Sequence, residues 1–329
     1  MPGLVGIFHQ GSKQIDLALF QLMMSSVNHK MFYRSTVVID KHKKYAAADV
    51  SLPTIKYSEQ PFIANNGSIT ILMHGEIYND DADPLNQLEY IYKLYQKFDI
   101  KFPIHLNGSF VILIIDELKK CVIIANDRTA SRPLLYFRSG GAFYCTPELK
   151  TLFLLPSLRM TLNLSAVASF LSCGYLLDGE TWLENVQALD NATILILSDE
   201  GTQFIKYWNY MFDEDPKDLG TDYYRHVLSD LLLRSVRNRL RSPHKYGVLL
   251  SGGYDSRGIL GCVLREKDPG EVNTISWGTQ EDIDHSDCAV AKRLSEKLGV
   301  RHTFYHLDSR KIPFHLKEFV YLSDGMTDA

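Results

Sequence analysis

The sequence predicts two domains of different fold class, an α+β domain built on antiparallel sheets followed by an α/β domain built on a doubly wound parallel sheet. Three observations predict this. Short β-type runs separated by Gly, Asn and Asp dominate residues 3–205. Helix and strand patterns then alternate from about residue 221. Between them, residues 211–220 carry four acidic residues, a proline and a glycine, as exposed linkers do.

The first domain, assigned to residues 1–209, is expected to hold seven strands and two helices. Its strand-like runs span residues 4–8, 36–39, 69–73, 110–115, 122–125, 134–137 and 193–197. Helical periodicity interrupts them only at about 85–95 and 165–171. A domain with so many short strands is expected to pack two antiparallel sheets face to face.

The second domain, assigned to residues 210–329, alternates helix and strand. The expected elements are helix 222–240, strand 247–251, helix 257–266, strand 272–277, helix 285–298 and strand 301–306. This alternation is typical of a parallel sheet with helices on both faces. In such a sheet, ligands bind beyond the carboxyl ends of the strands.

A loop of small residues stands where the strand at 247–251 meets a helix, with the sequence Ser251-Gly252-Gly253-Tyr254-Asp255-Ser256. Its two glycines let backbone N–H groups converge on an anion. The helix start adds partial positive charge, and the serine hydroxyls supply further donors. No lysine follows the glycines, which separates the loop from the Gly-Lys-Ser/Thr type and leaves Asp255 as a ligand for Mg²⁺. The alternative is an ordinary strand-to-helix turn rich in small residues.

Two further groups follow the next strand, at the same end of the expected sheet. That strand ends at Ser276, Trp277 and Gly278, whose backbone N–H and C=O groups could pair with the edge of an adenine ring. Asp284 and Asp287 then open the following helix. For these two carboxylates, capping of the helix N-terminus is favoured over a direct ligand role.

Composition excludes several classes of function. The 329 residues are 45% hydrophobic and 22% charged with a net charge of −4, so the chain is globular and carries no basic nucleic-acid or membrane footprint. Partners are expected to be small molecules or proteins. The five cysteines include no Cys-x-x-Cys pair, no signal peptide is recognisable, and the longest apolar run, 110–115, is too short for a bilayer. A reducing cytoplasm is expected.

His285 and Cys288 lie one helical turn apart, but two ligands do not make a zinc site.

The segment from Gly247 to Ser256 resembles the nucleotide loop of the asparagine synthetase family. In that family an ATP-pyrophosphatase domain cleaves ATP between its α and β phosphates, adenylates a carboxylate, and forms an amide when an amine displaces AMP. The resemblance implies a PP-loop fold, related to the adenine nucleotide α hydrolases, for the second domain. It also implies ATP and Mg²⁺ as cofactors, with Asp255 on the metal. The nucleotide-binding residues it implies are Leu250, Ser251, Gly252, Gly253, Asp255, Ser256, Ser276, Trp277 and Gly278.

The first domain is similar over most of its length to the family's class II glutamine amidotransferase half, which is an Ntn-type αββα sandwich. The matching segments are 74–79 (His-Gly-Glu-Ile-Tyr-Asn), Asp127 with 132–136 (Arg-Pro-Leu-Leu-Tyr), 146–152 (Thr-Pro-Glu-Leu-Lys-Thr-Leu), 170–176, 182–186 (Trp-Leu-Glu-Asn-Val) and 207–208 (Tyr-Trp). These segments occur in the same order in this chain and in the family, which argues against a chance match.

The residues that hydrolyse glutamine in the family are replaced. Active members carry a cysteine nucleophile where this chain has Pro2, and an oxyanion asparagine where it has His74. The aspartate that binds the amine of glutamine falls on Gln87, although Glu89 is retained, and residues 29–34 replace an Arg-Gly-Pro-Asp turn. The resemblance therefore implies a catalytically degenerate amidotransferase domain. Pro2 is either the plain start of a strand or, after methionine removal, a secondary amine able to form imines.

The family's second phosphate loop, of the Ser-Gly-x-Gly-x-Asp-Glu type, has no match after Ser256. The second domain is therefore expected to be incomplete at its C-terminus, either as a fragment or as a chain completed by a protein partner.

Two functions of different class compete. The first is an ATP-dependent amide-forming ligase that acts on a small-molecule or peptide carboxylate. Its amine would be free ammonia or the substrate's own, as in the family's lasso-peptide cyclases and β-lactam synthetases. The second is a non-catalytic module that binds a nucleotide or a protein without turnover. Release of pyrophosphate from ATP separates them.

Overall fold

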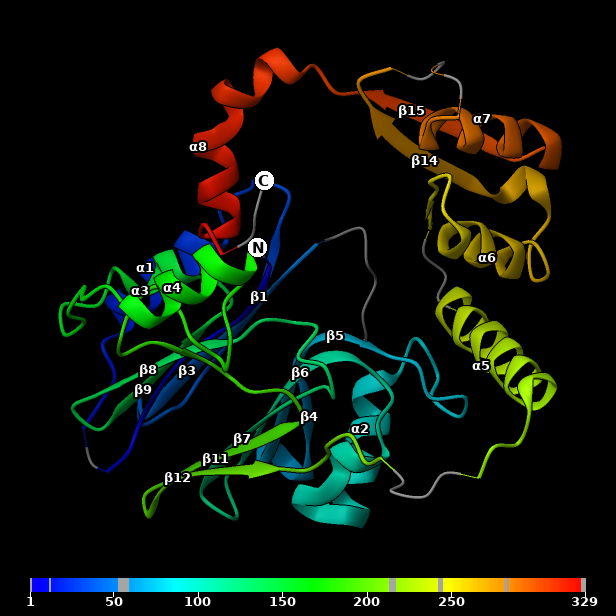
Figure 1. Ribbon diagram of the computed structural model, residues 1–329. Coiled ribbons are helices and arrows are strands. Elements are labelled where there is room, and N and C mark those ends of the chain that lie inside the picture. The colour runs from blue at the N-terminus through cyan, green and yellow to red at the C-terminus, as the bar shows by residue number, and fades with distance from the viewer. Residues whose placement is uncertain are drawn as a thin grey trace. The chain divides into compact units, whose positions relative to one another are not determined.

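The computed structural model describes residues 2–11, 13–52, 59–212, 217–241, 245–280, 283 and 285–326. The chain forms two compact units (Figure 1). The first comprises the chain up to Met211 together with the residues from Glu318 onward, and the second comprises Phe212–Lys317. The assignment of domains to 1–209 and 210–329 stays a prediction. The two compact units differ from this assignment mainly because the residues from Glu318 onward belong to the first unit.

The first unit contains two six-stranded sheets in which every strand pair is antiparallel. One sheet has the order β10 (Gln187–Ala188), β8 (Leu135–Ser139), β9 (Ala142–Thr146), β1 (Gly3–His9), β3 (Tyr45–Ser51), β2 (Arg34–Ile39). The other has the order β12 (Gly201–Lys206), β11 (Thr193–Ser198), β7 (Cys121–Asn126), β6 (Gly108–Asp116), β5 (Ile69–Ile77), β4 (Phe62–Ala64).

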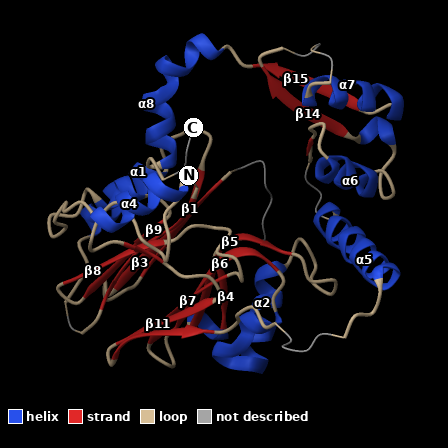
Figure 2. Ribbon diagram, in the orientation of Figure 1, coloured by secondary structure: helices blue, strands red, loops and turns tan. Residues whose placement is uncertain are grey.

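The two sheets pack face to face with helices on their outer faces (Figure 2). On β1, Leu4 and Phe8 enter the core shared by both sheets, whereas Val5 and Ile7 face the helical layer, as the period of two in a strand requires. That layer includes α1 (Leu17–Val27), α3 (Leu149–Leu152) and α4 (Leu164–Cys173), and α2 (Gln87–Phe98) covers the second sheet. The predicted αββα sandwich is thereby confirmed.

Several elements of this unit were missing from the sequence prediction. β3 contains Ala46, Ala47 and Ala48, which have low strand propensity but are fully buried where β3 lies between β1 and β2. The N-cap of α1, Asp16, accepts hydrogen bonds from Ala18 and Leu19 N–H at 2.9 and 3.1 Å, and this capping signal could have revealed the helix. β4, β9, β10, β12 and α3 were missed as well.

The second unit carries a three-stranded parallel sheet of order β13 (Val248–Leu249), β14 (Asn273–Gly278), β15 (Arg301–His306). Its helices are α5 (Thr221–Leu240), α6 (Tyr254–Val263) and α7 (Asp287–Leu298). A further helix, α8 (Ile312–Ser323), was not predicted. Short 3₁₀ segments lie at Asn65–Gly67, Asp99–His105, Pro269–Glu271 and Ser309–Lys311. No helix in the described part of the chain is long and apolar enough to cross a membrane.

The parallel sheet confirms the predicted fold class, with one local correction. The strand expected over 247–251 is paired only over β13, because the chain leaves the sheet after Leu250 N–H donates to Ile275 O at 2.8 Å. α6 starts at Tyr254, three residues earlier than predicted. Asp255 and Ser256 therefore belong to the first turn of the helix rather than to a loop.

Candidate functional site

Two serines hold the loop between β13 and α6 in shape. Ser251 N–H donates to Ser256 Oγ at 3.0 Å, and the two hydroxyl oxygens lie 2.9 Å apart. Gly253 N–H donates to Ser251 Oγ at 3.2 Å. The hydroxyls expected to serve as ligand donors are thus engaged in closing the loop on itself.

The first turn of α6 presents backbone N–H groups without a side-chain cap. Its N-cap is Gly253, which has no side chain to satisfy them, so this helix end keeps the partial positive charge and free donors that favour anions. Arg257 adds a cation at the same end. Its Nε donates to Gly253 O at 3.1 Å and its guanidinium lies 4.5 Å from the ring centre of Tyr254. No motif in the sequence indicated Arg257.

Asp287 faces the loop from the start of α7. A Cβ atom built on Gly252 would lie 2.5 Å from Asp287 Oδ1 and 3.0 Å from its Cα. The cap of α7 is Ser286, whose Oγ accepts from Ala289 N–H at 3.1 Å. The capping role expected of Asp287 is therefore wrong, since Asp287 is the first helical residue and its carboxylate lies against Gly252. Asp284 lies outside the described residues.

A cavity of about 350 Å³ opens between the end of β13, the end of β14 and the start of α7. Its lining residues are Leu249, Leu250, Ser251, Ser276, Trp277, Asp287 and Cys288. The sheet thus brings two sequence-distant parts of the predicted nucleotide site, 250–251 and 276–277, to one place. Gly252 lies against the lining residue Asp287, whereas Gly253, Asp255, Ser256 and Gly278 are not part of the lining.

The end of β14 is held by side-chain hydrogen bonds. Ser276 Oγ lies 3.1 Å from His302 Nε2, so its hydroxyl is turned toward β15, and Cys288 Sγ donates to Trp277 O at 3.2 Å. A Cβ on Gly278 would lie 2.9 Å from Cys288 Sγ. Cys288 therefore packs against this strand. Among the described residues, no group of three or more His, Cys, Asp or Glu side chains could hold a metal ion.

In the first unit, His74 on β5 joins the two sheets by contacting Asp49 on β3. Nδ1 of His74 lies 2.8 Å from Asp49 Oδ1, and the two side chains are 7% and 1% exposed. Gln87, at the start of α2, is also buried. Its Oε1 accepts from Ile77 N–H at 2.8 Å and its Nε2 donates to Pro84 O at 3.2 Å. Both polar groups are therefore engaged by the protein itself.

Asp127 organises the loop after β7. Its carboxylate accepts from the N–H groups of Phe110, Thr129 and Ser131 at 2.9–3.2 Å and from the Ser131 hydroxyl at 2.6 Å. Burial alone would raise the pKa of Asp127, but these hydrogen bonds together hold it below its usual value. The motif residue Asp127 thus has a structural role here.

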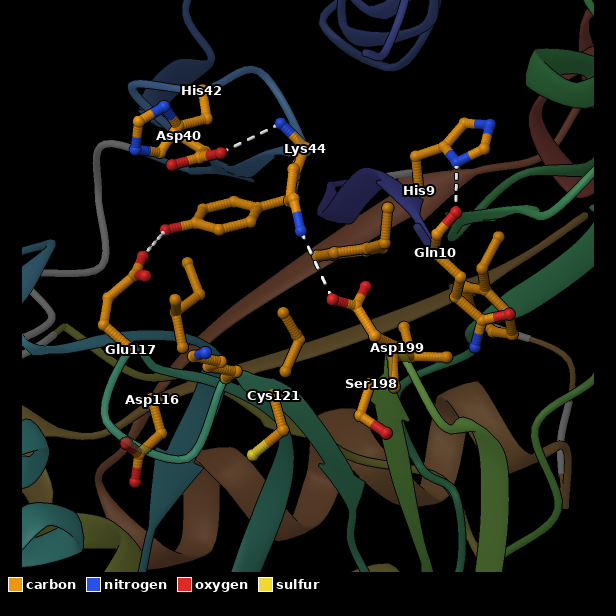
Figure 3. A pocket seen from close by; sticks show the side chains of 17 residues that line it. His9, Gln10, Asp40, His42, Lys44, Asp116, Glu117, Cys121, Ser198 and Asp199 are labelled. Atoms are coloured by element: carbon orange, nitrogen blue, oxygen red, sulfur yellow. Dashed lines mark hydrogen bonds and ion pairs between the residues drawn. The ribbon is translucent and has the colours of Figure 1, made fainter. Parts of the chain in front are cut away.

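A second cavity, of about 290 Å³, lies at the end of the sandwich where β1 finishes at His9. Figure 3 shows Lys44 reaching toward Asp199 on its rim, where Nζ and Oδ2 are 3.3 Å apart. The Tyr45 hydroxyl donates to Glu117. Burial, with this carboxylate, raises the pKa of Tyr45. None of the predicted amidotransferase residues lines this cavity, and no sequence motif indicated it.

Two family models match the chain. One, described as a glutamine amidotransferase domain, matches residues 1–208, and the other, described as asparagine synthase, matches residues 227–329. The fold and these matches define an amidotransferase-like sandwich followed in the chain by an asparagine-synthase-like unit.

Curated relatives point to the same family. "Asparagine synthetase [glutamine-hydrolyzing] 2" of Bacillus subtilis is 25% identical over a 349-residue alignment that covers 96% of this chain and 44% of the relative. A putative asparagine synthetase of Methanocaldococcus jannaschii is 23% identical, with 79% of this chain and 52% of the relative covered. The chain belongs to the asparagine synthetase family, as the sequence predicted. It spans about half the length of the curated relatives it matches.

Two other similar proteins carry different names. "Amidase chry2" of Gibberella zeae is 25% identical over 80% of this chain and 43% of its own length. Among solved structures, the glutamine phosphoribosylpyrophosphate amidotransferase of Bacillus subtilis, complexed with ADP and GMP, superposes with a TM-score of 0.45 at 14% identity, covering 96% of this chain and 70% of that one.

Proposed function

We propose that this chain belongs to an ATP-dependent amide-forming ligase that activates a carboxylate as its acyl-adenylate with release of pyrophosphate, and that it does not hydrolyse glutamine. One observation carries the proposal. The loop that leads from β13 into the uncapped first turn of α6 lines, through Ser251, a cavity that the end of β14 also lines, at the carboxyl edge of a parallel sheet. Backbone N–H groups there suit the phosphates of ATP, and the cavity wall at Trp277 suits its adenine.

The same site fits a magnesium ion by the chemistry of its donors. Asp255 in the first turn of α6 and Asp287 at the start of α7, whose carboxylate lies near Gly252, would supply carboxylate oxygens, the ligands Mg²⁺ prefers. When bound, Mg²⁺ would neutralise phosphate charge and assist departure of pyrophosphate. The residues themselves orient the triphosphate. Gly252 leaves room for Asp287 beside the loop, and Arg257 adds positive charge at the helix end.

The first unit supports the absence of glutamine hydrolysis. Pro2 offers no nucleophilic side chain, and β1 contains no cysteine. At the oxyanion position, Nδ1 of His74 is committed to Asp49, and a carboxylate so close disfavours a developing anion. Gln87, at the position that binds the substrate ammonium, is neutral and its carbonyl oxygen is already occupied by Ile77 N–H.

Replacing Pro2 by cysteine is expected not to create glutaminase activity, because His74 still stands at the oxyanion position and Gln87 still lacks the negative charge that binds the substrate ammonium. Glutamate formation from L-glutamine measures this. The triple variant Pro2→Cys, His74→Asn, Gln87→Asp is the comparison that asks whether the three positions together suffice. Glutamate production by Pro2→Cys alone, above the wild-type background, would show that the pocket is still competent.

Pyrophosphate release tests the ligase directly. The chain is incubated with MgATP, ammonium chloride and a panel of carboxylates that begins with L-aspartate. We expect release of pyrophosphate that depends on the carboxylate and is lost in Asp255→Asn. Nucleotide binding without release for any carboxylate would contradict the ligase and favour the alternative, a non-catalytic module that binds nucleotide or protein.

A further inference from the structure

Three motif segments that the proposed function does not use meet at one place in the first unit. They are residues 29–34, which replace the family's Arg-Gly-Pro-Asp turn, residues 146–152, and residues 182–186. Each of them contacts the segment Glu318–Met326, which contains the end of α8 and the residues after it. This segment follows β15 in the sequence but belongs to the first compact unit (Figure 1).

The carboxylate of Asp324 binds the backbone where α3 begins. Oδ2 accepts from Leu149 N–H at 2.6 Å, and Oδ1 lies 3.4 Å from Lys150 N. The N-cap residue of α3, Glu148, makes no side-chain capping bond, so Asp324 supplies the acceptor that the local sequence does not. The Asp324 side chain is only 9% exposed, which strengthens the contact.

Lys150 makes two polar contacts with the same segment and a third with Glu148 beneath it. Its Nζ donates to Tyr321 O at 2.7 Å and lies 3.2 Å from Asp324 Oδ1 and 3.0 Å from Glu148 Oε2. Lys150 is 13% exposed and Glu148 is fully buried. Removing one member of such a cluster leaves a buried charge without compensation, so the segment and the surface beneath it depend on each other.

Aromatic and apolar contacts complete the surface. Trp182 Nε1–H donates to Asp324 O at 3.1 Å, and the ring of His29 meets the ring of Tyr321 edge-on with centroids 5.7 Å apart. Met326 packs against the core under α1 and α3. By contrast, the Lys30–Glu318 pair is exposed, with a separation of 3.9 Å, and is expected to contribute little.

We infer that the amidotransferase-like unit serves as a docking surface for its own chain, which clamps the segment Glu318–Met326 through Asp324 and Lys150. Because the segment is covalently tethered, its high effective concentration favours docking without a large interface. Docking would give the degenerate unit a role that requires neither glutamine nor ATP.

Hydrogen exchange on the full chain tests the clamp. In Asp324→Ala we expect exchange of the Leu149 and Lys150 amides, and of residues 318–323, to accelerate at least about tenfold, because their partners are lost. Amides of β5, β6 and β14 should keep their wild-type rates. Asp308→Ala is the matched control, since Asp308 accepts from Arg310 N–H at 3.1 Å at a short helical start before α8 and touches none of the docking surface.

A second variant guards against general unfolding. Lys150→Met keeps the length and apolar stem of the side chain while removing its charge, and it should accelerate exchange over 318–323 as Asp324→Ala does. The clamp is contradicted if both variants leave exchange of 149–150 and 318–323 unchanged. It is equally contradicted if 318–323 exchanges as fast as an unstructured peptide in the wild-type chain.

Discussion

Gly252→Ala is expected to weaken MgATP binding by about 2 kcal/mol or more, roughly thirtyfold in Kd. The new Cβ would lie 2.5 Å from Asp287 Oδ1 and 3.0 Å from Asp287 Cα. The carboxylate can rotate away, but the Cα belongs to the backbone of α7, so the loop or the helix must shift. Either shift changes the cavity that both segments line. Isothermal titration with MgATP measures the effect.

Gly261→Ala provides the matched control on the same helix. Its Cβ would meet nothing within 4 Å, so the substitution should leave Kd unchanged and add up to about 1 kcal/mol of stability by raising helix propensity. Equal affinity of wild-type and Gly252→Ala chains would show that the approach of the loop to α7 does not shape the nucleotide site.

Gly75→Ala is expected to cost the first unit about 4 kcal/mol or more of unfolding free energy. Gly75 lies inside β5 with φ +130°, a region that disfavours side chains. A Cβ would also lie 2.0 Å from Ser109 O and 2.7 Å from Phe110 Cα on the paired strand β6. Because both obstacles are backbone atoms of the paired strand, the two strands must separate. Urea unfolding in a Trp277→Phe background, where Trp182 and Trp208 report this unit, measures the loss.

Gly67→Ala separates the two causes. Gly67 has φ +91° but nothing within 4 Å of a built Cβ, so only the conformational cost remains, about 1 kcal/mol. If the two variants lose the same stability, the close approach of β5 and β6 is not what requires glycine at position 75.

Elements with a strong local pattern could be predicted from the sequence. β6 and β7 are continuous apolar runs buried on both faces, and the alternation of α6, β14, α7 and β15 defines a parallel sheet by order alone. β3 could not be predicted, because alanine has a low strand propensity and is required here only by the packing of the neighbouring strands. β9 had an available signal, the Gly140-Gly141 turn that joins it to β8.

The residues of the candidate site also fall into two groups, those that a local sequence pattern indicates and those that only packing brings together. The phosphate loop is local, so its glycines and Asp255 could be found from a strand, small residues and a helix in succession. The approach of Asp287 to Gly252 depends on how α7 packs beside β14, which no short window encodes. The contact of Asp324 with Leu149 joins residues 175 positions apart and was likewise out of reach.

Calorimetric titration of the folded chain with MgATP, repeated on Asp255→Asn, is the sharpest test of nucleotide binding at Ser251–Ser256. We expect saturable binding at millimolar nucleotide or below in the wild-type chain and its loss in the variant. Asp222→Asn, which changes an aspartate in the first turn of α5, should bind as the wild type does. Absence of any binding heat in the wild-type chain, or unchanged binding by Asp255→Asn, would contradict the nucleotide site at Ser251–Ser256.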